Sequence, residues 1–255
     1  MIQELCGVQE VCEVAESIYV LKFVSEGISK SVCAGQFVNI KTENSFIPLL
    51  RRPFSVYRTE GESVEIIFNV IGRGSAALQR KRAGEMLDVL GPLGSPFTIH
   101  RSDFETAVLV GGGLGVAPLP ILTQFLKRAR KDILTILGAR TARRLVDTHL
   151  EQVHVSTDDG SRGFHGTVVD LAKRLLQNHT VKNPKIFGCG PTPMLRALGV
   201  FAIEHDIPSE FSLEGPMGCG VGICQGCPVE LVHGDKKYAL MCTDGPTFDI
   251  HSIRI

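Results

Sequence analysis

Four cysteines near the carboxyl end form the most specific chemical pattern in this sequence. Cys219, Cys224, Cys227 and Cys242 have the spacing C-x4-C-x2-C-x14-C, and glycines lie between the first three. Four thiolates are a complete ligand set for one [2Fe–2S] cluster, and the first three cysteines have plant-type ferredoxin spacing. Small residues between them allow backbone N–H groups to point at the sulfurs. We therefore interpret the four cysteines as ligands of a [2Fe–2S] cluster.

Zinc is the alternative occupant of the same four thiolates. Structural zinc sites prefer paired C-x2-C units, and Cys224 and Cys227 form the only such unit in this segment. The last gap is shorter than in plant-type ferredoxins, so the segment is not a whole ferredoxin domain. The spacing favours iron and sulfur, and a non-catalytic zinc-binding interaction module is the alternative from another functional class.

Glycine-rich turns form a second pattern. VLVGGGLGVAP follows an apolar run and opens a predicted helix, whose N-terminus suits a pyrophosphate. It departs from the full dinucleotide-binding fingerprint, because Pro118 replaces the third glycine and Arg140 stands where an acid is expected. FGCGPTPM ends a later predicted strand and places Cys189 at the carboxyl edge of a sheet, where α/β proteins bind ligands. Taken alone, a tight turn and a buried inert cysteine are the alternatives.

Two further segments have residues suited to phosphate. IGRGSAAL places Gly72, Gly74 and Ser75 at the start of a short predicted helix. RRPFS places Arg51 and Arg52 before a proline, and an arginine at that point can hold a phosphate with two hydrogen bonds. Successive strand residues point to opposite faces, so we expect only one of the two arginines to face a ligand. Taken alone, a surface arginine is the alternative.

Three regions with different residue patterns must position these motifs. Residues 1–101 contain short runs rich in Val, Ile, Phe and Tyr, which predict an antiparallel sandwich or small barrel. Residues 102–210 alternate strand-like and helix-like runs, which predict a parallel sheet with helices on its faces. The last of these helices is expected to begin after Thr192 as its N-cap. Residues 211–255 hold four of the eight cysteines, and we expect three domains with these boundaries.

Composition excludes several classes of protein. Lys and Arg total 27, as do Asp and Glu, so a general nucleic-acid binder is not expected. The N-terminus has no basic region typical of a signal peptide, and cysteines are too sparse for a disulfide scaffold, so we expect a reducing cytoplasm. Residues 106–126 are uncharged and long enough to cross a membrane. Their glycines and prolines instead predict a strand, a turn and a helix, and no membrane span is expected.

Together the motifs are more specific than any one of them. The order RPFS, GRGS, GGGLGVAP, GCGPTPM resembles the ferredoxin–NADP reductase superfamily. With the cysteines added, nearly the whole chain resembles the electron-transfer subunits of bacterial type B dihydroorotate dehydrogenases, including the stretches TDDGSRGFHG and CTDGPTFD. The resemblance implies a six-stranded antiparallel β-barrel for FAD, an α/β domain with a parallel sheet for NAD(H), and a small C-terminal [2Fe–2S] domain.

The resemblance also implies roles for matching residues. Arg52 would bind the FAD diphosphate, Ser55 would lie near the flavin ring, and Cys189 would lie near the nicotinamide. The full implied set for FAD is Arg52, Pro53, Phe54, Ser55, Asn69, Val70, Ile71, Gly74 and Ser75. Gly113 and Gly115 would receive NAD(H).

The implied function is electron transfer in pyrimidine biosynthesis. A dihydroorotate dehydrogenase catalytic subunit would oxidise dihydroorotate, and electrons would pass through the cluster and FAD to NAD+, in a heterotetramer with two copies of each chain. This chain would not itself carry the dihydroorotate site. A subunit of an NADH-dependent ferredoxin:NADP oxidoreductase or sulfide dehydrogenase is the alternative, since it shares these cofactors. The choice of NAD or NADP stays open, because Arg140 can meet a 2′-phosphate although the resemblance points to NAD.

Overall fold

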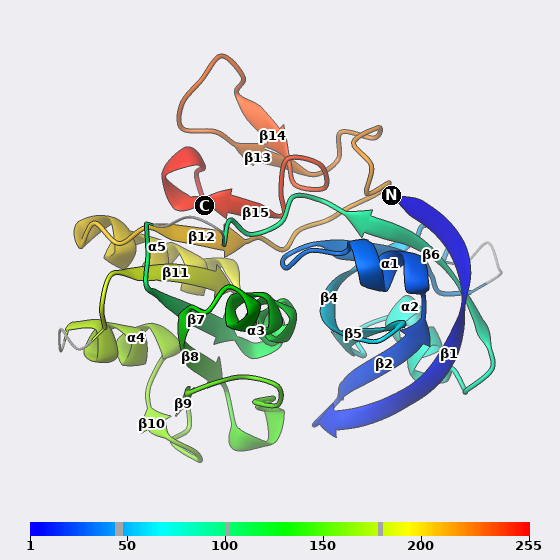
Figure 1. Ribbon diagram of the computed structural model, residues 1–255, viewed down its shortest axis with the longest axis horizontal. Helices are drawn as coiled ribbons and strands as arrows, with labels where there is room; N and C mark the ends of the chain where they lie inside the picture. The colour runs from blue at the N-terminus through cyan, green and yellow to red at the C-terminus, as the bar shows by residue number, and fades with distance from the viewer. Residues whose placement is uncertain (44–47, 100–102, 178–180) are drawn as a thin grey trace.

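The computed structural model describes residues 1–43, 48–99, 103–177 and 181–255. Figure 1 shows two large bodies side by side, a barrel and an open sheet with helices, with the C-terminal segment lying across them. The boundary expected between the first two domains, at residues 101 and 102, lies outside the described residues.

The N-terminal body is a closed barrel with strand order β1-β2-β5-β4-β3-β6, in which every neighbouring pair is antiparallel. Side chains alternate between the two sides of each strand, so Val38 and Ile40 of β3 fill the interior while Asn39 points outward. This confirms the predicted six-stranded barrel. Its strands are β1 (Ile2–Ala15), β2 (Ile18–Val24), β3 (Phe37–Lys41), β4 (Arg52–Glu60), β5 (Ser63–Asn69) and β6 (Met86–Leu93).

Two short helices complete the barrel. Helix α1 (Glu26–Ser31) begins where the Ser25 hydroxyl accepts a hydrogen bond from the Ile28 N–H at 3.1 Å, and Ile28 is fully buried in the barrel core. Helix α2 (Arg73–Gln79) follows the β5 strand and begins at the predicted glycine turn.

The second body is a seven-stranded sheet in the order β10-β9-β8-β7-β11-β12-β15. The first six strands are parallel, as predicted, and β15 pairs with β12 in the antiparallel direction. The chain therefore returns from its C-terminal segment to add the edge strand. The strands are β7 (Thr106–Gly112), β8 (Asp132–Ala139), β9 (Val153–Thr157), β10 (Phe164–His165), β11 (Pro184–Cys189), β12 (Ser209–Ser212) and β15 (Thr247–Asp249).

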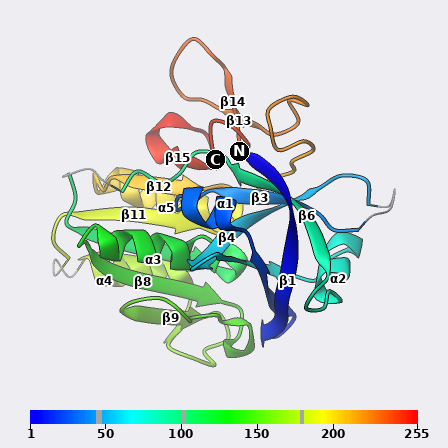
Figure 2. The same ribbon diagram turned by 45° about the vertical axis from the view of Figure 1, so that its right-hand side comes forward.

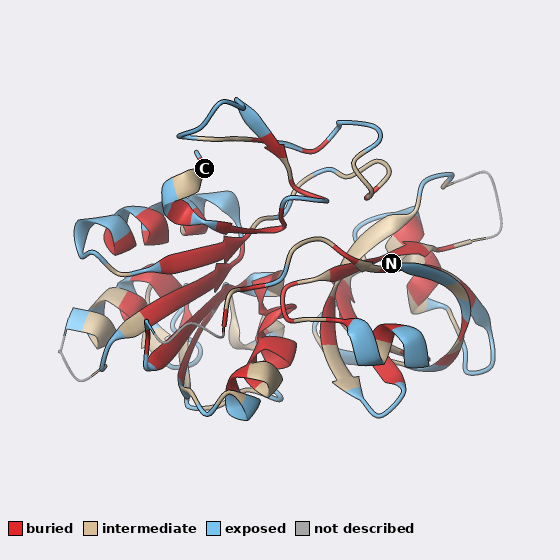
Figure 3. Cartoon of the chain, turned by 45° about the horizontal axis from the view of Figure 1, so that its top comes forward, coloured by how far each residue is buried: buried red, intermediate tan, exposed pale blue. Residues whose placement is uncertain are grey.

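Helices cover both faces of this sheet. Helix α3 (Leu119–Arg128) packs with the barrel core, whereas α4 (Val168–Gln177) and α5 (Thr192–Glu204) bury their apolar residues against the other face. Figure 3 shows the buried residues concentrated in the strands and on the inner sides of these helices. Short 3-10 turns lie at η1 (Gly113–Val116), η2 (Ala142–Arg144) and η3 (Ile250–Ser252).

The predicted N-cap of α5 is wrong by one residue. Pro191 is the N-cap, because its carbonyl accepts from the N–H groups of Met194 and Leu195, and Thr192 is already helical. A proline suits this place since its missing N–H is not needed there.

The C-terminal segment forms a two-stranded antiparallel sheet of β13 (Pro228–Glu230) and β14 (Tyr238–Leu240). Its apolar core includes Phe37 and Leu93 of the barrel and Phe248 of β15. The segment therefore packs on both bodies, as Figures 1 and 2 show.

The uncharged stretch 106–126 forms β7, η1 and part of α3, in agreement with the predicted strand, turn and helix. Within the described ranges, no helix has the length and apolar character needed to cross a membrane.

Candidate functional site

A cleft of about 900 Å³ lies between the barrel, the start of α2 and the loop that leads from β12 into the C-terminal segment. Eight of the residues predicted to bind FAD line it, namely Arg52, Pro53, Phe54, Ser55, Asn69, Ile71, Gly74 and Ser75. Val70 packs instead against the barrel core, where its side chain is partly buried. The structure therefore gathers residues from β4, β5 and α2 around one cavity.

Arg52 is the first residue of β4 and Arg51 directly precedes it, and the two side chains lie in different environments. Arg52 lines the cleft, and a Cβ on Gly74 would lie 3.3 Å from its Cγ, so the glycine lets the arginine pack across the start of α2. Arg51 forms an ion pair of 2.6 Å with Asp88 of β6. Of the two arginines, only Arg52 lines the cleft, and its Nη1 donates to the Leu50 carbonyl oxygen at 2.8 Å.

Two buried polar atoms near the cleft fit a polar ligand. Asn69, which lines the cleft, and Thr42, whose hydroxyl would lie 3.5 Å from a Cβ on Gly74, each have a buried side-chain oxygen without a hydrogen-bond partner among the described residues. Buried polar atoms normally have partners. A bound molecule rich in hydroxyl, amide and phosphate groups, such as FAD, would supply them.

The two glycine turns of the sheet touch each other. Cys189 of β11 pairs in register with Gly111 of β7, so both turns emerge at the same carboxyl edge. A Cβ on Gly115 would lie 2.0 Å from the Cys189 carbonyl oxygen, so no larger residue fits there. Gly113 has a positive φ of 56° and open space where a Cβ would be, which leaves backbone exposed to a ligand. Gly113, Gly115 and Cys189 thus form one edge, the place where α/β sheets bind ligands.

Glu214 connects this edge to the cleft. It lines the cleft, and its Oε1 is 4.0 Å from the Cys189 sulfur. Burial raises the pKa of the Cys189 thiol well above its usual range, and burial also raises the pKa of the Glu214 carboxyl. Both shifts favour the uncharged forms of the two groups. Sequence reasoning missed Glu214, although its place in LEGPMGC, directly before the cysteine motif, was a usable signal.

The four C-terminal cysteines lie close enough to influence one another, Cys219 with Cys224, and Cys242 with both Cys227 and Cys219. Backbone N–H groups of Cys224 and Val221 donate to the Cys219 sulfur at 3.4 Å, and these bonds lower the pKa of that thiol to about 7. Burial, followed by the neighbouring Cys227 thiol, raises the pKa of Cys242 to about 11. Four neighbouring thiols are the number of ligands that an iron–sulfur cluster takes.

Glycines make room for these sulfurs. A Cβ on Gly218 would lie 3.2 Å from the Cys224 sulfur, and a Cβ on Gly226 would lie 3.5 Å from it. The Gly222 N–H donates to the Cys242 sulfur at 3.2 Å. Donor chemistry and space both fit a cluster. Across the part of the chain that the structure describes, no three His, Cys, Asp or Glu side chains are grouped as ligands of a single metal ion.

One aromatic side chain stands between the cleft and the cysteines. Phe37 of β3 lines the cleft and also belongs to the apolar core that contains Cys227 and Cys242. The side chain is 2% exposed. The two candidate sites therefore share a wall.

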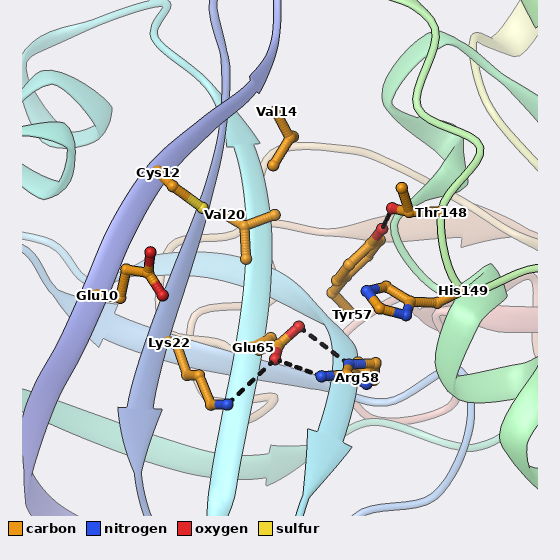
Figure 4. A pocket seen from close by; sticks show the side chains of 10 residues that line it. All are labelled: Glu10, Cys12, Val14, Val20, Lys22, Tyr57, Arg58, Glu65, Thr148 and His149. Atoms are coloured by element: carbon orange, nitrogen blue, oxygen red, sulfur yellow. Dashed lines mark hydrogen bonds and ion pairs between the residues drawn. The ribbon is translucent and has the colours of Figure 1, made fainter.

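A smaller cavity of about 260 Å³ lies on the outer wall of the barrel, facing the loop before β9 (Figure 4). Glu65 on β5 forms ion pairs with Arg58 on β4 and Lys22 on β2. The Tyr57 hydroxyl shares a 3.0 Å hydrogen bond with Thr148 of the sheet body. The ion pairs lie within the barrel, whereas the bond between Tyr57 and Thr148 joins the two bodies, and sequence reasoning did not anticipate it.

Comparison with known proteins gives a consistent result. The family model for the iron-sulfur cluster binding domain of dihydroorotate dehydrogenase B matches residues 214–254. This match favours iron and sulfur over the zinc alternative for the four cysteines.

Curated relatives match almost the full length. The electron transfer subunit of dihydroorotate dehydrogenase B (NAD(+)) from Desulforamulus reducens is 36% identical over 244 residues, with 92% of each chain covered. The subunit of the same name from Fusobacterium nucleatum is 35% identical over 260 residues, covering 99% of this chain and 98% of the relative.

Solved structures share the fold. A chain from the structure of an NADH-dependent reduced ferredoxin-NADP oxidoreductase, studied for flavin-based electron bifurcation, has a TM-score of 0.87 and 29% identity, with 98% of this chain and 90% of that chain covered. The ferredoxin reductase of carbazole 1,9a-dioxygenase has a TM-score of 0.71 at 20% identity, with coverage of 82% and 68%.

Proposed function

Because this chain belongs to the family of electron transfer subunits of dihydroorotate dehydrogenase B, we propose that it carries electrons between a dihydroorotate dehydrogenase catalytic subunit and NAD+ by way of a [2Fe–2S] cluster and FAD. The observation that carries the proposal is the shared wall at Phe37, since the cleft and the four cysteines must exchange electrons across it.

Each proposed cofactor serves a different step of the electron transfer. FAD, when bound, exchanges hydride with nicotinamide and single electrons with an iron–sulfur centre, so it belongs between them. In this chain Arg52, Gly74 and Ser75 would hold the diphosphate, and Ser55 would lie near the flavin ring. Pro53, Phe54, Asn69 and Ile71 would complete that site, and Val70, whose side chain packs on the barrel core, would contribute only backbone.

The sheet edge would receive the nicotinamide cofactor. Gly113 and Gly115 would present backbone to NAD(H), and the neutral Cys189 thiol would lie beside the nicotinamide without attacking it. We assign residues 1–101 to FAD, 102–210 to NAD(H) and 211–255 to the cluster, with β15 returning from the third region to the sheet of the second.

The overall reaction balances across the two subunits. Dihydroorotate loses two electrons and two protons in becoming orotate, NAD+ takes up a hydride, and one proton goes to solvent. We propose a complex with two copies of each chain in the cytoplasm, a compartment that suits the eight free cysteines of the described structure.

Coexpression with the catalytic subunit from the same host tests this function. The purified complex should carry about one FAD and about two iron atoms per copy of this chain, and dihydroorotate should generate NADH from NAD+. Cys219→Ser should abolish NADH formation, whereas Cys33→Ser, a thiol outside the cluster motif, should not. Full activity in the Cys219→Ser complex would contradict the proposed route.

The likeness to the NADH-dependent ferredoxin-NADP oxidoreductase favours one other candidate, in which the same cofactors serve a different partner. Recovery of the chain from its host with an NADP-linked partner, together with no NADH from dihydroorotate, would establish that candidate instead.

A further inference from the structure

Asn39 occupies an unusual place between the two sites. It lies in the middle of β3, 1% exposed, with its side chain on the outer face of the barrel. Its strand partner in β4 is Pro53, which lines the cleft. Figure 2 shows the segment with the cysteines lying above β3 and β6. Asn39 is therefore an amide buried in the wall between the proposed flavin and cluster sites.

The Asn39 side chain holds the first cysteine of the motif. Its Nδ2 donates to the Cys219 carbonyl oxygen at 3.0 Å, across 180 positions of sequence. The next residue, Gly220, has a φ of 75°, and a Cβ there would lie 2.5 Å from Asn39 Nδ2. Gly220 thus provides both the turn and the space that let the cysteine loop rest on the amide.

Packing alone does not account for an asparagine here. Its Oδ1 is buried and has no hydrogen-bond partner within the described chain. Burying an unsatisfied oxygen is unfavourable, and an apolar side chain of similar size would avoid it. The amide is therefore kept at a cost to stability, which is common where a polar group serves a site.

From this contact we infer that Asn39 is a positioning residue for electron transfer between the flavin and the cluster. It fixes the Cys219 loop against the barrel, and its amide dipole, positive at Nδ2, lies next to a cluster ligand. Hydrogen bonds to the sulfurs of a cluster raise its reduction potential because they stabilise the added negative charge. The loop that Asn39 holds carries the Val221 and Cys224 N–H groups, which donate to the Cys219 sulfur at 3.4 Å. The transfer moves one electron and breaks no bond, and Asn39 gives up no proton. The inference rests on the proposed function.

Two variants with side chains of similar size test the N–H donor of Asn39 separately from the volume of its side chain. Asn39→Leu removes the N–H donor, and Asn39→Asp replaces it with an acceptor of negative charge. The cluster midpoint potential is measured by electron paramagnetic resonance during redox titration of the holoprotein. We expect Asn39→Leu to make the cluster about tenfold harder to reduce, about 59 mV more negative for one electron. Asn39→Asp should shift the potential further in the same direction.

The matched control is Thr135→Val. Thr135 of β8 is also fully buried with an unpartnered side-chain oxygen in the described structure, but it lies in the other body. This variant should leave the cluster potential unchanged. If Asn39→Leu does not retain the cluster, Asn39→Asp provides the test on its own, because it keeps the size and a polar oxygen of the side chain.

The outcomes separate two kinds of failure. A wild-type chain that binds neither flavin nor cluster would refute the proposed function itself. A wild-type chain with both cofactors, together with cluster-bearing Asn39 variants at the wild-type potential, would overturn the role of Asn39 and leave the function standing.

Discussion

Replacement of Arg52 by alanine should weaken FAD binding strongly. The Arg52 guanidinium lines the cleft and packs across Gly74 at the start of α2, where the diphosphate would lie. Hydrogen bonds to charged groups contribute about 1.5–3 kcal/mol, and about 1.4 kcal/mol corresponds to a tenfold change in affinity. We therefore expect Arg52→Ala to lower the affinity for FAD by roughly 10- to 100-fold.

Arg51→Ala is the matched control, since it removes the same charge one position earlier. Arg51 is engaged by Asp88, and both side chains are 20% exposed. Such a pair contributes about 0.2–1 kcal/mol to folding and does not face the cleft. The affinity for FAD should change by no more than about twofold, the usual effect of a surface substitution.

Titration of the FAD-free chain, followed by quenching of flavin fluorescence, measures both affinities directly. Thermal unfolding of each FAD-free variant shows whether the fold is intact. Equal and small losses of affinity in the two variants would refute the placement of Arg52 at the diphosphate.

Three further predictions concern the cluster, the buried ion pair between Lys185 of β11 and Glu210 of β12, and pH. Cys224→Ser should lose the cluster signal in electron paramagnetic resonance, because serine oxygen is a poorer ligand for iron. NADH should still reduce the bound FAD in this variant. Loss of flavin reduction while FAD stays bound would contradict the order of transfer from NADH to FAD to the cluster. Lys185→Met should destabilise the chain by about 3–5 kcal/mol in urea unfolding, because it leaves Glu210 buried without its 2.8 Å partner. The double variant with Glu210→Met should regain most of that loss, and failure to regain it would count against the ion pair as the cause. Burial raises the pKa of Glu214 above 4.5, so the folded chain favours the protonated carboxyl and stability falls as pH rises. Glu214→Gln should therefore be more stable than wild type by a margin that grows above pH 4.5 and vanishes below it, and a constant margin across urea titrations at different pH would refute the cause.

The sequence predicts the elements with regular local patterns well. Short runs rich in Val, Ile, Phe and Tyr predicted the barrel strands, and the alternation of strand-like and helix-like runs predicted the parallel sheet with its helices. The cysteine spacing pointed to the cluster because its four ligands lie within a short segment. Residues near one another in the sequence determine these features, so a local sequence pattern predicts them.

Contacts between distant segments are not visible in such patterns. The three-residue strand β15 gives no periodic signal, and its antiparallel place beside β12 follows from tertiary packing. The Asn39 contact with Cys219 joins residues that no local rule connects. The pair of Glu214 and Cys189 likewise forms only after two loops meet.

The helix start at Pro191 shows a smaller limit of the same kind. Thr192 has the better intrinsic preference for an N-cap. In the folded chain the Pro191 carbonyl accepts from the Met194 and Leu195 N–H groups, so the helix begins one residue earlier than the side-chain preference predicts.

In the proposed route, electrons pass between NADH and the cluster through FAD. The most direct measurement is anaerobic addition of NADH to the cluster-bearing chain with FAD present and after FAD has been removed, with cluster reduction followed by electron paramagnetic resonance. We predict a reduced-cluster signal only when FAD is present, while dithionite reduces the cluster in both samples. Reduction of the cluster by NADH at the same rate without FAD would contradict the account.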